Sequence, residues 1–202
     1  MLQAIRLLVK SYGQDKIIII NSGIGTPFQK NGDCCMWESF IYSWAWEGRR
    51  HSWSDVKKRA QDNEWFLNAG RKITALSFLD PSRKEAKEDA FWAFSAAKLA
   101  DFIWWASLNG TGAEILYQAH LGKTLGPLVE KNGIAFRIYE NGVIVLNDND
   151  TDQSVEITVP ANLKIRNLKD LFNNQQLVQL RNKKLKVTIP KSASRVYVIS
   201  LN

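Results

Sequence analysis

The chain has 202 residues, of which 45% are hydrophobic, enough for one large core or two small ones. Its net charge is +7, but the excess is spread thinly and forms no basic block interleaved with aromatic residues, so nucleic acid is not an expected partner. No stretch is long and apolar enough to span a membrane, so no membrane partner is expected. The start of the chain has no signal-peptide pattern. As it stands the chain is expected in the cytoplasm, with a secreted parent protein as the alternative.

The two cysteines, Cys34 and Cys35, are adjacent in the sequence. Neighbouring cysteines cannot link distant parts of a chain, so no disulfide framework is expected. Only two histidines accompany them, and no metal-ligand spacing occurs. We therefore expect both thiols to be reduced and buried in a strand, which fits a reducing compartment, and we expect no metal site.

Three segments have helical patterns. The first begins near the N-terminus, where apolar residues recur at helical spacing, and Gly13 would end it. Ser52 or Ser54 would cap a second helix that runs to about residue 68. Ser82 and Glu85 have the spacing of a capping box and would start a third helix that ends near residue 100.

Four short apolar segments alternate with these helices, and each has the length and composition of a buried strand. They cover residues 17–21 (IIIIN), 34–39 (CCMWES), 73–79 (ITALSFL) and 102–107 (FIWWAS). Strands that alternate with helices are typical of βαβ units, so we expect a parallel sheet with right-handed crossovers. The gap between the first two strands is barely long enough for a crossover and is expected to hold one helical turn or an irregular segment.

The sequence pattern changes after Gly122. Short alternating segments follow, separated by turn residues, and Asn141-Gly142 is a strong hairpin signal. Such segments predict a small antiparallel, all-β domain. The expected strands cover residues 134–139, 143–147, 155–159, 185–189 and 196–201.

Ordered motifs along the chain resemble a known family. IIIINSGIG, DCCMWESF, KITALSFL and residues 101–117 resemble the later strands of glycoside hydrolases with a TIM-barrel catalytic domain. LGKTLGPL followed by FRIYENGVIVLND resembles the start of the C-terminal β domain of that family, and VTIPKSASRVYVISL resembles its last two strands. The resemblance implies the C-terminal half of a (β/α)8-type barrel at residues 1–122 and a C-terminal β-sandwich accessory domain at residues 123–202.

The expected barrel is incomplete. A full barrel has eight parallel strands, whereas about four are expected here. The resemblance therefore implies a fragment or truncated reading frame, or a partner that supplies the missing N-terminal barrel half. Self-association is a further possibility, because a half barrel leaves two open sheet edges.

Glu38 is the first candidate for chemistry. It ends a predicted strand, and barrel active sites lie at the C-terminal ends of strands. A carboxyl group beside Trp37 and its aromatic neighbours is expected to be desolvated, which raises the pKa and suits a general acid. Hydrolysis normally requires a second carboxylate, which we place on the missing strands, with Asp80 as a weaker substitute. The alternative role for Glu38 is an ion pair with Arg49 or Arg50.

Aromatic and small polar residues at strand ends are candidates for sugar binding. Indole faces stack on the C–H faces of sugar rings, and small polar groups bind hydroxyls. About half of the strand-end tryptophans are expected to fill the core instead, and the small polar residues have turn capping as an alternative role. The candidates are Asn21, Trp37, Trp44, Ser77, Trp105 and Ser107, of which Trp44 and Trp105 are expected to be accessible.

The resemblance implies a glycoside hydrolase-like fragment that acts on an oligo- or polysaccharide, with Glu38 as acid or nucleophile and with no metal or organic cofactor. The chain alone is expected to be a poor catalyst or none, because the earlier strands are missing. Two alternatives are a non-catalytic carbohydrate-binding protein and an interaction protein that assembles through its barrel edge.

Overall fold

A computed structural model describes residues 2–21, 26–42, 50–160, 163 and 167–199. The chain divides into two compact units. The first unit comprises Met1–Phe78 and Ala100–Ser107, and the second comprises Leu79–Leu99 and Leu108–Asn202. The chain therefore passes between the units more than once. The domain boundary expected between residues 122 and 123 stays a prediction.

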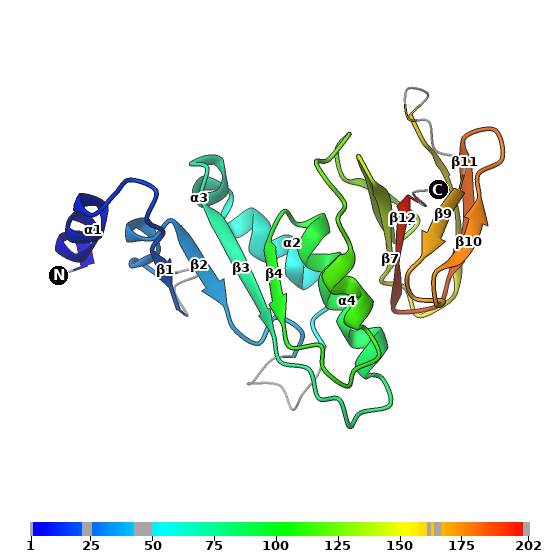
Figure 1. The fold of residues 1–202 in the computed structure, drawn as a ribbon, viewed down its shortest axis with the longest axis horizontal. Coiled ribbons are helices and arrows are strands. Elements are labelled where there is room, and N and C mark those ends of the chain that lie inside the picture. The colour runs from blue at the N-terminus through cyan, green and yellow to red at the C-terminus, as the bar shows by residue number, and fades with distance from the viewer. Residues whose placement is uncertain (1, 22–25, 43–49, 161–162, 164–166, 200–202) are drawn as a thin grey trace. The chain divides into compact units, whose positions relative to one another are not determined.

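The first unit is built on a four-stranded parallel sheet whose strand order follows the chain (Figure 1). All three strand pairs are parallel, which confirms the predicted parallel sheet. The strands are β1 (Ile19–Ile20), β2 (Cys34–Trp37), β3 (Lys72–Ser77) and β4 (Ile103–Ala106). Between β1 and β2 lies one 3₁₀ turn, η1 (Gln29–Asn31), as the short gap predicted.

Strand β1 is shorter and more exposed than the sequence predicts. Only Ile19 and Ile20 pair with β2, and Ile17 and Ile19 are 70% and 54% exposed. The prediction of a buried strand over residues 17–21 is therefore wrong. The reason is that β1 lies at the edge of the sheet, where no other described strand covers its outer side.

The structure divides the helix predicted after Ser52 into two helices, α2 (Trp53–Asp62) and α3 (Glu64–Asn68). Ser52 caps the start of α2, because its Oγ accepts from the backbone N–H of Asp55 at 3.1 Å while its own N–H donates to the Asp55 carboxylate at 2.8 Å. Asn63 separates α2 from α3, and its side chain donates a hydrogen bond to the Arg59 carbonyl at 2.7 Å. Helix α1 (Leu2–Ser11) also belongs to this unit.

Both cysteines are buried and free, as predicted. The Sγ of Cys34 lies 2.7 Å from the Oγ1 of Thr74 on the neighbouring strand. Burial raises the pKa of the Cys35 thiol to about 11, with Cys34 adding to the effect. Because the thiolate is the reactive form, this pair is chemically inert near neutral pH.

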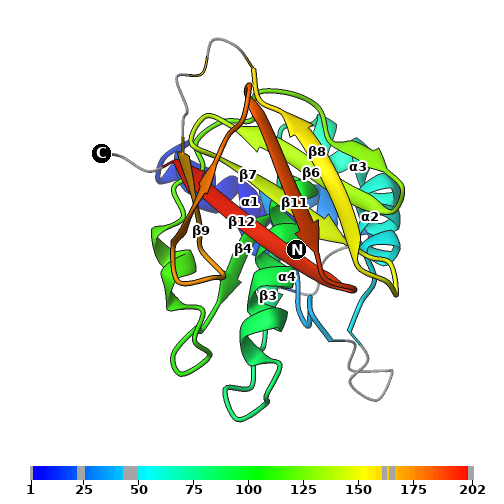
Figure 2. The ribbon, with the colours of Figure 1, turned by 90° about the vertical axis from the view of Figure 1, so that its right-hand side faces the viewer.

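The second unit contains two antiparallel sheets, a six-stranded one in the order β10-β9-β12-β7-β6-β5 and a two-stranded one of β11 and β8. Figure 2 shows β8 and β11 side by side in front of β6, β7 and β12. All five predicted strands are present, and Asn141-Gly142 joins β6 to β7 as expected. The strands are β5 (Val129–Lys131), β6 (Ile134–Tyr139), β7 (Gly142–Asn147), β8 (Gln153–Thr158), β9 (Asn167–Asp170), β10 (Gln176–Gln179), β11 (Lys184–Ile189) and β12 (Ala193–Ile199).

Strand β7 is buried on both faces, which explains its unbroken apolar sequence. Val143 and Val145 face the core between the two sheets. The alternate residues Ile144 and Leu146 are also fully buried, on the opposite face. Helix α4 (Ala86–Leu99) packs against β12, β7 and β6. The second unit is therefore layered, with a helix, a six-stranded sheet and a two-stranded sheet.

Helix α4 begins later than the sequence predicts. Its first residue is Ala86, and the capping box expected from Ser82 and Glu85 does not form. Instead, the hydroxyl and the backbone N–H of Ser82 both donate to the Asp80 carboxylate, at 2.7 and 2.9 Å. Ser82 is thus used in a local turn of the kind that competes with helix starts.

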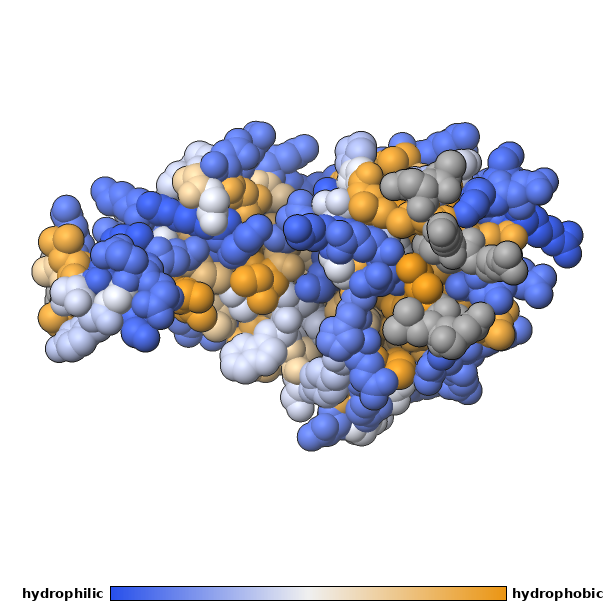
Figure 3. Space-filling view, turned by 45° about the horizontal axis from the view of Figure 1, so that its top comes forward, coloured by the Kyte–Doolittle hydropathy of each residue, from blue (hydrophilic) through white to orange (hydrophobic). Residues whose placement is uncertain are grey.

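The surface of α1 carries an unusual number of exposed apolar residues. Ile5, Leu7 and Leu8 are 43%, 67% and 59% exposed, and Tyr12 just beyond the helix is 77% exposed. Figure 3 shows apolar residues at the surface near the N-terminal end of the chain, where α1 lies. No helix among the described residues combines the length and the hydropathy needed to cross a membrane.

Candidate active site

Glu38 directly follows the last residue of β2, at the C-terminal end of the parallel sheet, and is half-buried. Met36 on β2 pairs in register with Thr74 on β3, and Leu76 on β3 pairs with Trp105 on β4. Side chains alternate between the faces of a strand, so Glu38 continues the face and row that hold Leu76 and Trp105.

Trp105 is the accessible indole of this row. It is 63% exposed, as the sequence predicted. The strands that carry Glu38 and Trp105 are two positions apart in the sheet. With strands about 4.8 Å apart, the two backbones lie about 10 Å from each other. The sheet therefore brings a carboxyl group and a flat aromatic surface to the same face at the C-terminal ends of its strands.

Trp37 and Ser77 lie on the opposite face of the sheet. Trp37 is 6% exposed and packs edge-on against Phe40 and His51, with ring centroids 5.0 and 5.3 Å apart. Ser77 is 2% exposed, and its Oγ accepts a hydrogen bond from the Trp104 indole N–H at 3.0 Å. This geometry favours packing roles for both residues, and their predicted sugar contacts stay predictions.

The remaining sugar-binding candidates follow the outer strands. Asn21 comes directly after β1 and Ser107 directly after β4, and both are exposed. Trp44 falls in residues 43–49 and lies outside the described residues. Asn21 and Ser107 are thus at the same end of the sheet as Glu38, because all the strands run in one direction.

Asp80, the predicted substitute for a second carboxylate, belongs to the second unit, whereas Glu38 belongs to the first. The hydrogen bonds from the side chain and backbone of Ser82 lower the pKa of Asp80. A lowered pKa keeps the carboxyl group ionised, which suits a base or nucleophile and not a general acid. No group of three or more His, Cys, Asp or Glu side chains in the described residues could hold a metal ion.

Ser39 is a feature that sequence reasoning missed. Its backbone is left-handed, with φ of 56°, and its side chain is 6% exposed with no hydrogen-bond partner among the described residues. The sharp turn lets the next N–H, that of Phe40, donate to the carbonyl of Leu76 at 2.9 Å. Nothing in the sequence around Ser39 signals this conformation.

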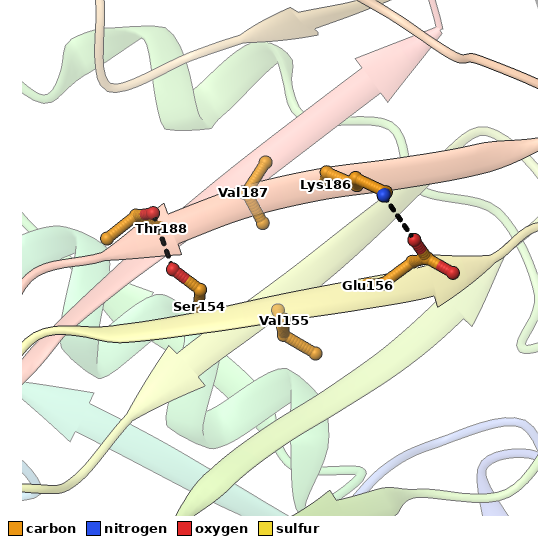
Figure 4. Close-up of a pocket in the computed structure, with 6 residues that line it drawn as sticks. All are labelled: Ser154, Val155, Glu156, Lys186, Val187 and Thr188. Carbon is orange, nitrogen blue, oxygen red and sulfur yellow. Dashed lines mark hydrogen bonds and ion pairs between the residues drawn. The ribbon is translucent and has the colours of Figure 1, made fainter.

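A concave feature lies on the two-stranded sheet of the second unit, away from the residues considered so far in the sequence (Figure 4). It is an open depression of about 440 Å³ lined by β8 and β11. Ser154 and Thr188 hydrogen-bond across the strands at 2.8 Å, and Glu156 bridges Lys184 and Lys186 at 2.6 and 2.9 Å. The two lysines lower the pKa of Glu156 to about 2. The polar groups that line the depression already form hydrogen bonds and ion pairs with one another, so we assign no ligand to it.

No protein family and no curated protein matches the sequence. Solved structures do match the fold. α-Galactosidase I from Mortierella vinacea has a TM-score of 0.58 at 12% identity, over 98% of this chain and 62% of its own. The GH27 β-L-arabinopyranosidase from Geobacillus stearothermophilus has a TM-score of 0.58 at 12% identity, over 98% of this chain and 53% of its own. An α-amylase from Anoxybacillus has a TM-score of 0.51 at 14% identity, over 98% of this chain and 55% of its own.

These similarities define the fold of the chain. A parallel sheet with helices, followed by antiparallel sheets, is a glycoside hydrolase-like fold. The chain spans less than two thirds of the length of each of these three enzymes.

Proposed function

We propose that this chain is part of a glycoside hydrolase that cleaves glycosidic bonds in an oligo- or polysaccharide, with Glu38 as its acid or nucleophile. The observation that carries the proposal is the row that Glu38 and Trp105 share at the C-terminal ends of parallel strands. An exposed indole offers a stacking surface for a sugar ring, and a half-buried carboxyl group two strands away on the same face would supply proton transfer. The glycoside hydrolase-like fold supports the same location, because active sites of barrel enzymes lie at the C-terminal ends of the strands.

The fold neighbours suggest which sugars to test. The Geobacillus arabinopyranosidase has been solved in complex with arabinose, and AmyP in complex with maltotriose. The Mortierella enzyme is an α-galactosidase. Chromogenic α-galactosides, β-L-arabinopyranosides and maltooligosaccharides therefore form the first panel of substrates, and Asn21 and Ser107 are proposed to contact their hydroxyl groups.

The decisive variant is Glu38→Gln, which removes the ionisable group and keeps the shape of the side chain. If the chain, or the longer protein that contains it, hydrolyses a glycoside of the panel, we expect the kcat of Glu38→Gln to fall about a thousandfold. The matched control is Glu64→Gln, at an exposed position on α3, which should keep the wild-type rate. Hydrolysis by Glu38→Gln at a near wild-type rate would exclude Glu38 as the catalytic group.

A non-catalytic carbohydrate-binding protein is the second candidate function. It is favoured by one observation: among the described residues of the first unit, Glu38 is the only carboxylate that directly follows a strand of the parallel sheet. Sugar binding would then quench the fluorescence of Trp105 without turnover. A Trp105→Ala variant that loses the quenching, in a chain that releases no product from any member of the panel, would favour this function over hydrolysis.

A further inference from the structure

Phe78 is an exposed aromatic residue close to the candidate site. It is the first residue after β3 and belongs to the same unit as Glu38. Its exposed fraction is 51%, whereas that of the preceding residue, Ser77, is 2%. Side chains alternate between the faces of a strand, so Phe78 lies on the face of Leu76. Because Leu76 and Trp105 are paired on the face that holds Glu38, Phe78 lies on that face too.

The face that holds Phe78 becomes more open toward the end of β3. Thr74 is 6% exposed, Leu76 is half-buried and Phe78 is 51% exposed. Strands β2 and β3 remain hydrogen-bonded just past Glu38, because the N–H of Phe40 donates to the carbonyl of Leu76 at 2.9 Å. The pairing that fixes the position of Phe78 therefore reaches the end of β3.

Phe78 lies between Glu38 and Trp105 across the sheet, because β3 lies between β2 and β4. Glu38 and Trp105 flank Leu76, and Phe78 is two residues further along β3. With strands about 4.8 Å apart and a rise of about 3.3 Å per residue, the backbone of Phe78 lies about 8 Å from those of Glu38 and Trp105. Aromatic side chains reach across diagonal separations of this size. One carboxyl group and two aromatic rings are therefore neighbours on a single face.

On the basis of the proposed function, we infer that Trp105 and Phe78 stack on two consecutive rings of an oligosaccharide whose glycosidic bond lies beside Glu38. The substrate class is then a chain of linked sugars and not the glycoside of a single sugar. Trp105 shares the row of Glu38 and takes the ring at the bond that breaks. Phe78 lies nearer the open end of the strands and takes the next ring.

The chemistry of the two aromatic side chains gives them different roles. The phenyl ring of Phe78 has no hydrogen-bonding group, so it contacts the C–H face of a sugar without reading its hydroxyl groups. The indole of Trp105 has an N–H that can donate to a hydroxyl. Phe78 therefore selects for the length of the sugar chain and not for the kind of sugar.

The test measures binding in the Glu38→Gln chain, so that hydrolysis does not consume the ligand. Each sugar of the substrate panel is offered as its methyl glycoside and as a linear trisaccharide, and the Kd is measured by isothermal titration calorimetry. Adding Phe78→Ala should weaken trisaccharide binding about tenfold and methyl glycoside binding less than about threefold. Phe78→Tyr keeps the flat ring and should bind as the parent does. Phe78→Leu keeps most of the apolar volume without a flat face and should bind as weakly as Phe78→Ala.

The matched control is Trp65→Ala. Trp65 is another exposed aromatic residue of the first unit, with an exposed fraction of 52%. It lies on α3, which precedes the start of β3 and is therefore at the end of the sheet away from Glu38. Trp65→Ala should keep both affinities. Far-UV circular dichroism checks that each variant is folded.

An unchanged trisaccharide affinity in Phe78→Ala would overturn the inference, as would an equal loss for both ligands or no binding of any trisaccharide. Hydrolysis that requires Glu38 but is indifferent to Phe78→Ala would keep the proposed function and remove the second ring. Trisaccharide binding that depends on Phe78, in a wild-type chain that hydrolyses no member of the panel, would support the two stacking residues and refute the proposed function.

Discussion

Asp33 anchors α1 to the start of the parallel sheet. Its carboxylate accepts from the side chains of Arg6 and Lys10, both at 2.9 Å, and from the backbone N–H of Ile18 at 3.0 Å. Burial raises the pKa of Asp33, but the contacts with Lys10, Ile18 and Arg6 outweigh it and lower the pKa to about 2. Asp33 lies just before β2 and therefore at the end of the sheet away from Glu38, where it holds the structure together.

We predict that Asp33→Asn lowers the free energy of unfolding by about 1 kcal/mol at pH 7, after solvent screening. The folded-state pKa lies below the ordinary 3.8, so the stabilisation is complete above that pH and is lost as the pH falls through about 2. Urea unfolding followed by tryptophan fluorescence, at pH 7 and pH 2, measures the difference.

The control for Asp33 is Asp62→Asn, which breaks the exposed pair with Lys58 on α2. Both side chains of that pair are more than half exposed, so the loss should stay below about 0.5 kcal/mol. If Asp33→Asn lowered the free energy of unfolding by the same amount at pH 7 and at pH 2, the charge of Asp33 would not be the source of the stabilisation.

The candidate site was predictable from the sequence only in part. Glu38 and Trp105 could be found because each lies at the end of an apolar strand, and strand ends meet at one edge of a parallel sheet. The same reasoning also selects Trp37 and Ser77, because it does not consider which face of the strand a residue occupies. Trp37 is adjacent to Glu38, and alternation therefore turns it toward the opposite face. The left-handed turn at Ser39 depends on tertiary packing and leaves no sequence signal.

At the scale of elements, one loop fastens helix α4 to the six-stranded sheet. The ring of Phe172 lies 5.1 Å from the ring of Phe91 on α4 and 3.9 Å from the guanidinium of Arg195 on β12. Lys87 on α4 lies 4.6 Å from the same ring and donates to the Phe172 carbonyl at 2.7 Å. A single aromatic residue therefore contacts both elements.

We expect Phe172→Ala to lower the free energy of unfolding by about 2 kcal/mol, less than for a fully buried ring because Phe172 is half-buried. Thermal unfolding followed by far-UV circular dichroism measures the change. Leu177→Ala, at an exposed position on β10 in the same unit, serves as the control and should change stability by less than about 0.5 kcal/mol. If the two variants unfold at the same temperature, Phe172 does not couple α4 to the sheet.

The elements that sequence reasoning found are those with strong internal patterns. Strand β6 is mostly apolar, and β7 is almost continuously apolar. The two strands flank an Asn-Gly turn, so the sequence predicts them almost to the residue. Strands β5 (VEK), β9 (NLKD) and β10 (QLVQ) are short and mostly polar, and were missed. They are strands because of the neighbours with which they pair, and strand propensity depends on such context.

At the scale of the whole molecule, the order of the motifs predicted the glycoside hydrolase-like fold, although no sequence family matches. The sequence does not predict that α4 belongs to the second unit. Its sequence lies between β3 and β4 of the parallel sheet, but it packs on the six-stranded sheet of the second unit. The crossover helix of a βαβ unit is normally assigned to its own sheet, and sequence order alone cannot show another partner.

This grouping predicts which shortened chains fold. A chain of residues 123–202 lacks α4 and would expose Ile144, Leu146 and Val196, all fully buried on one face of the six-stranded sheet. The loss should be on the order of 5 kcal/mol. Residues 79–202 retain α4, although they also carry β4 without its partner β3, and should unfold cooperatively and be more stable than residues 123–202. Equal stability of the two chains in urea unfolding would argue that α4 is dispensable.

The placement of α4 also has an evolutionary consequence. Accessory modules that spread between enzymes by recombination are contiguous in the gene, so one breakpoint can transplant them intact. Here helix α4, which covers the six-stranded sheet, is encoded between β3 and β4 of the parallel sheet. A crossover that carried away the C-terminal strands alone would strip them of their covering helix, so the two units are expected to be inherited together.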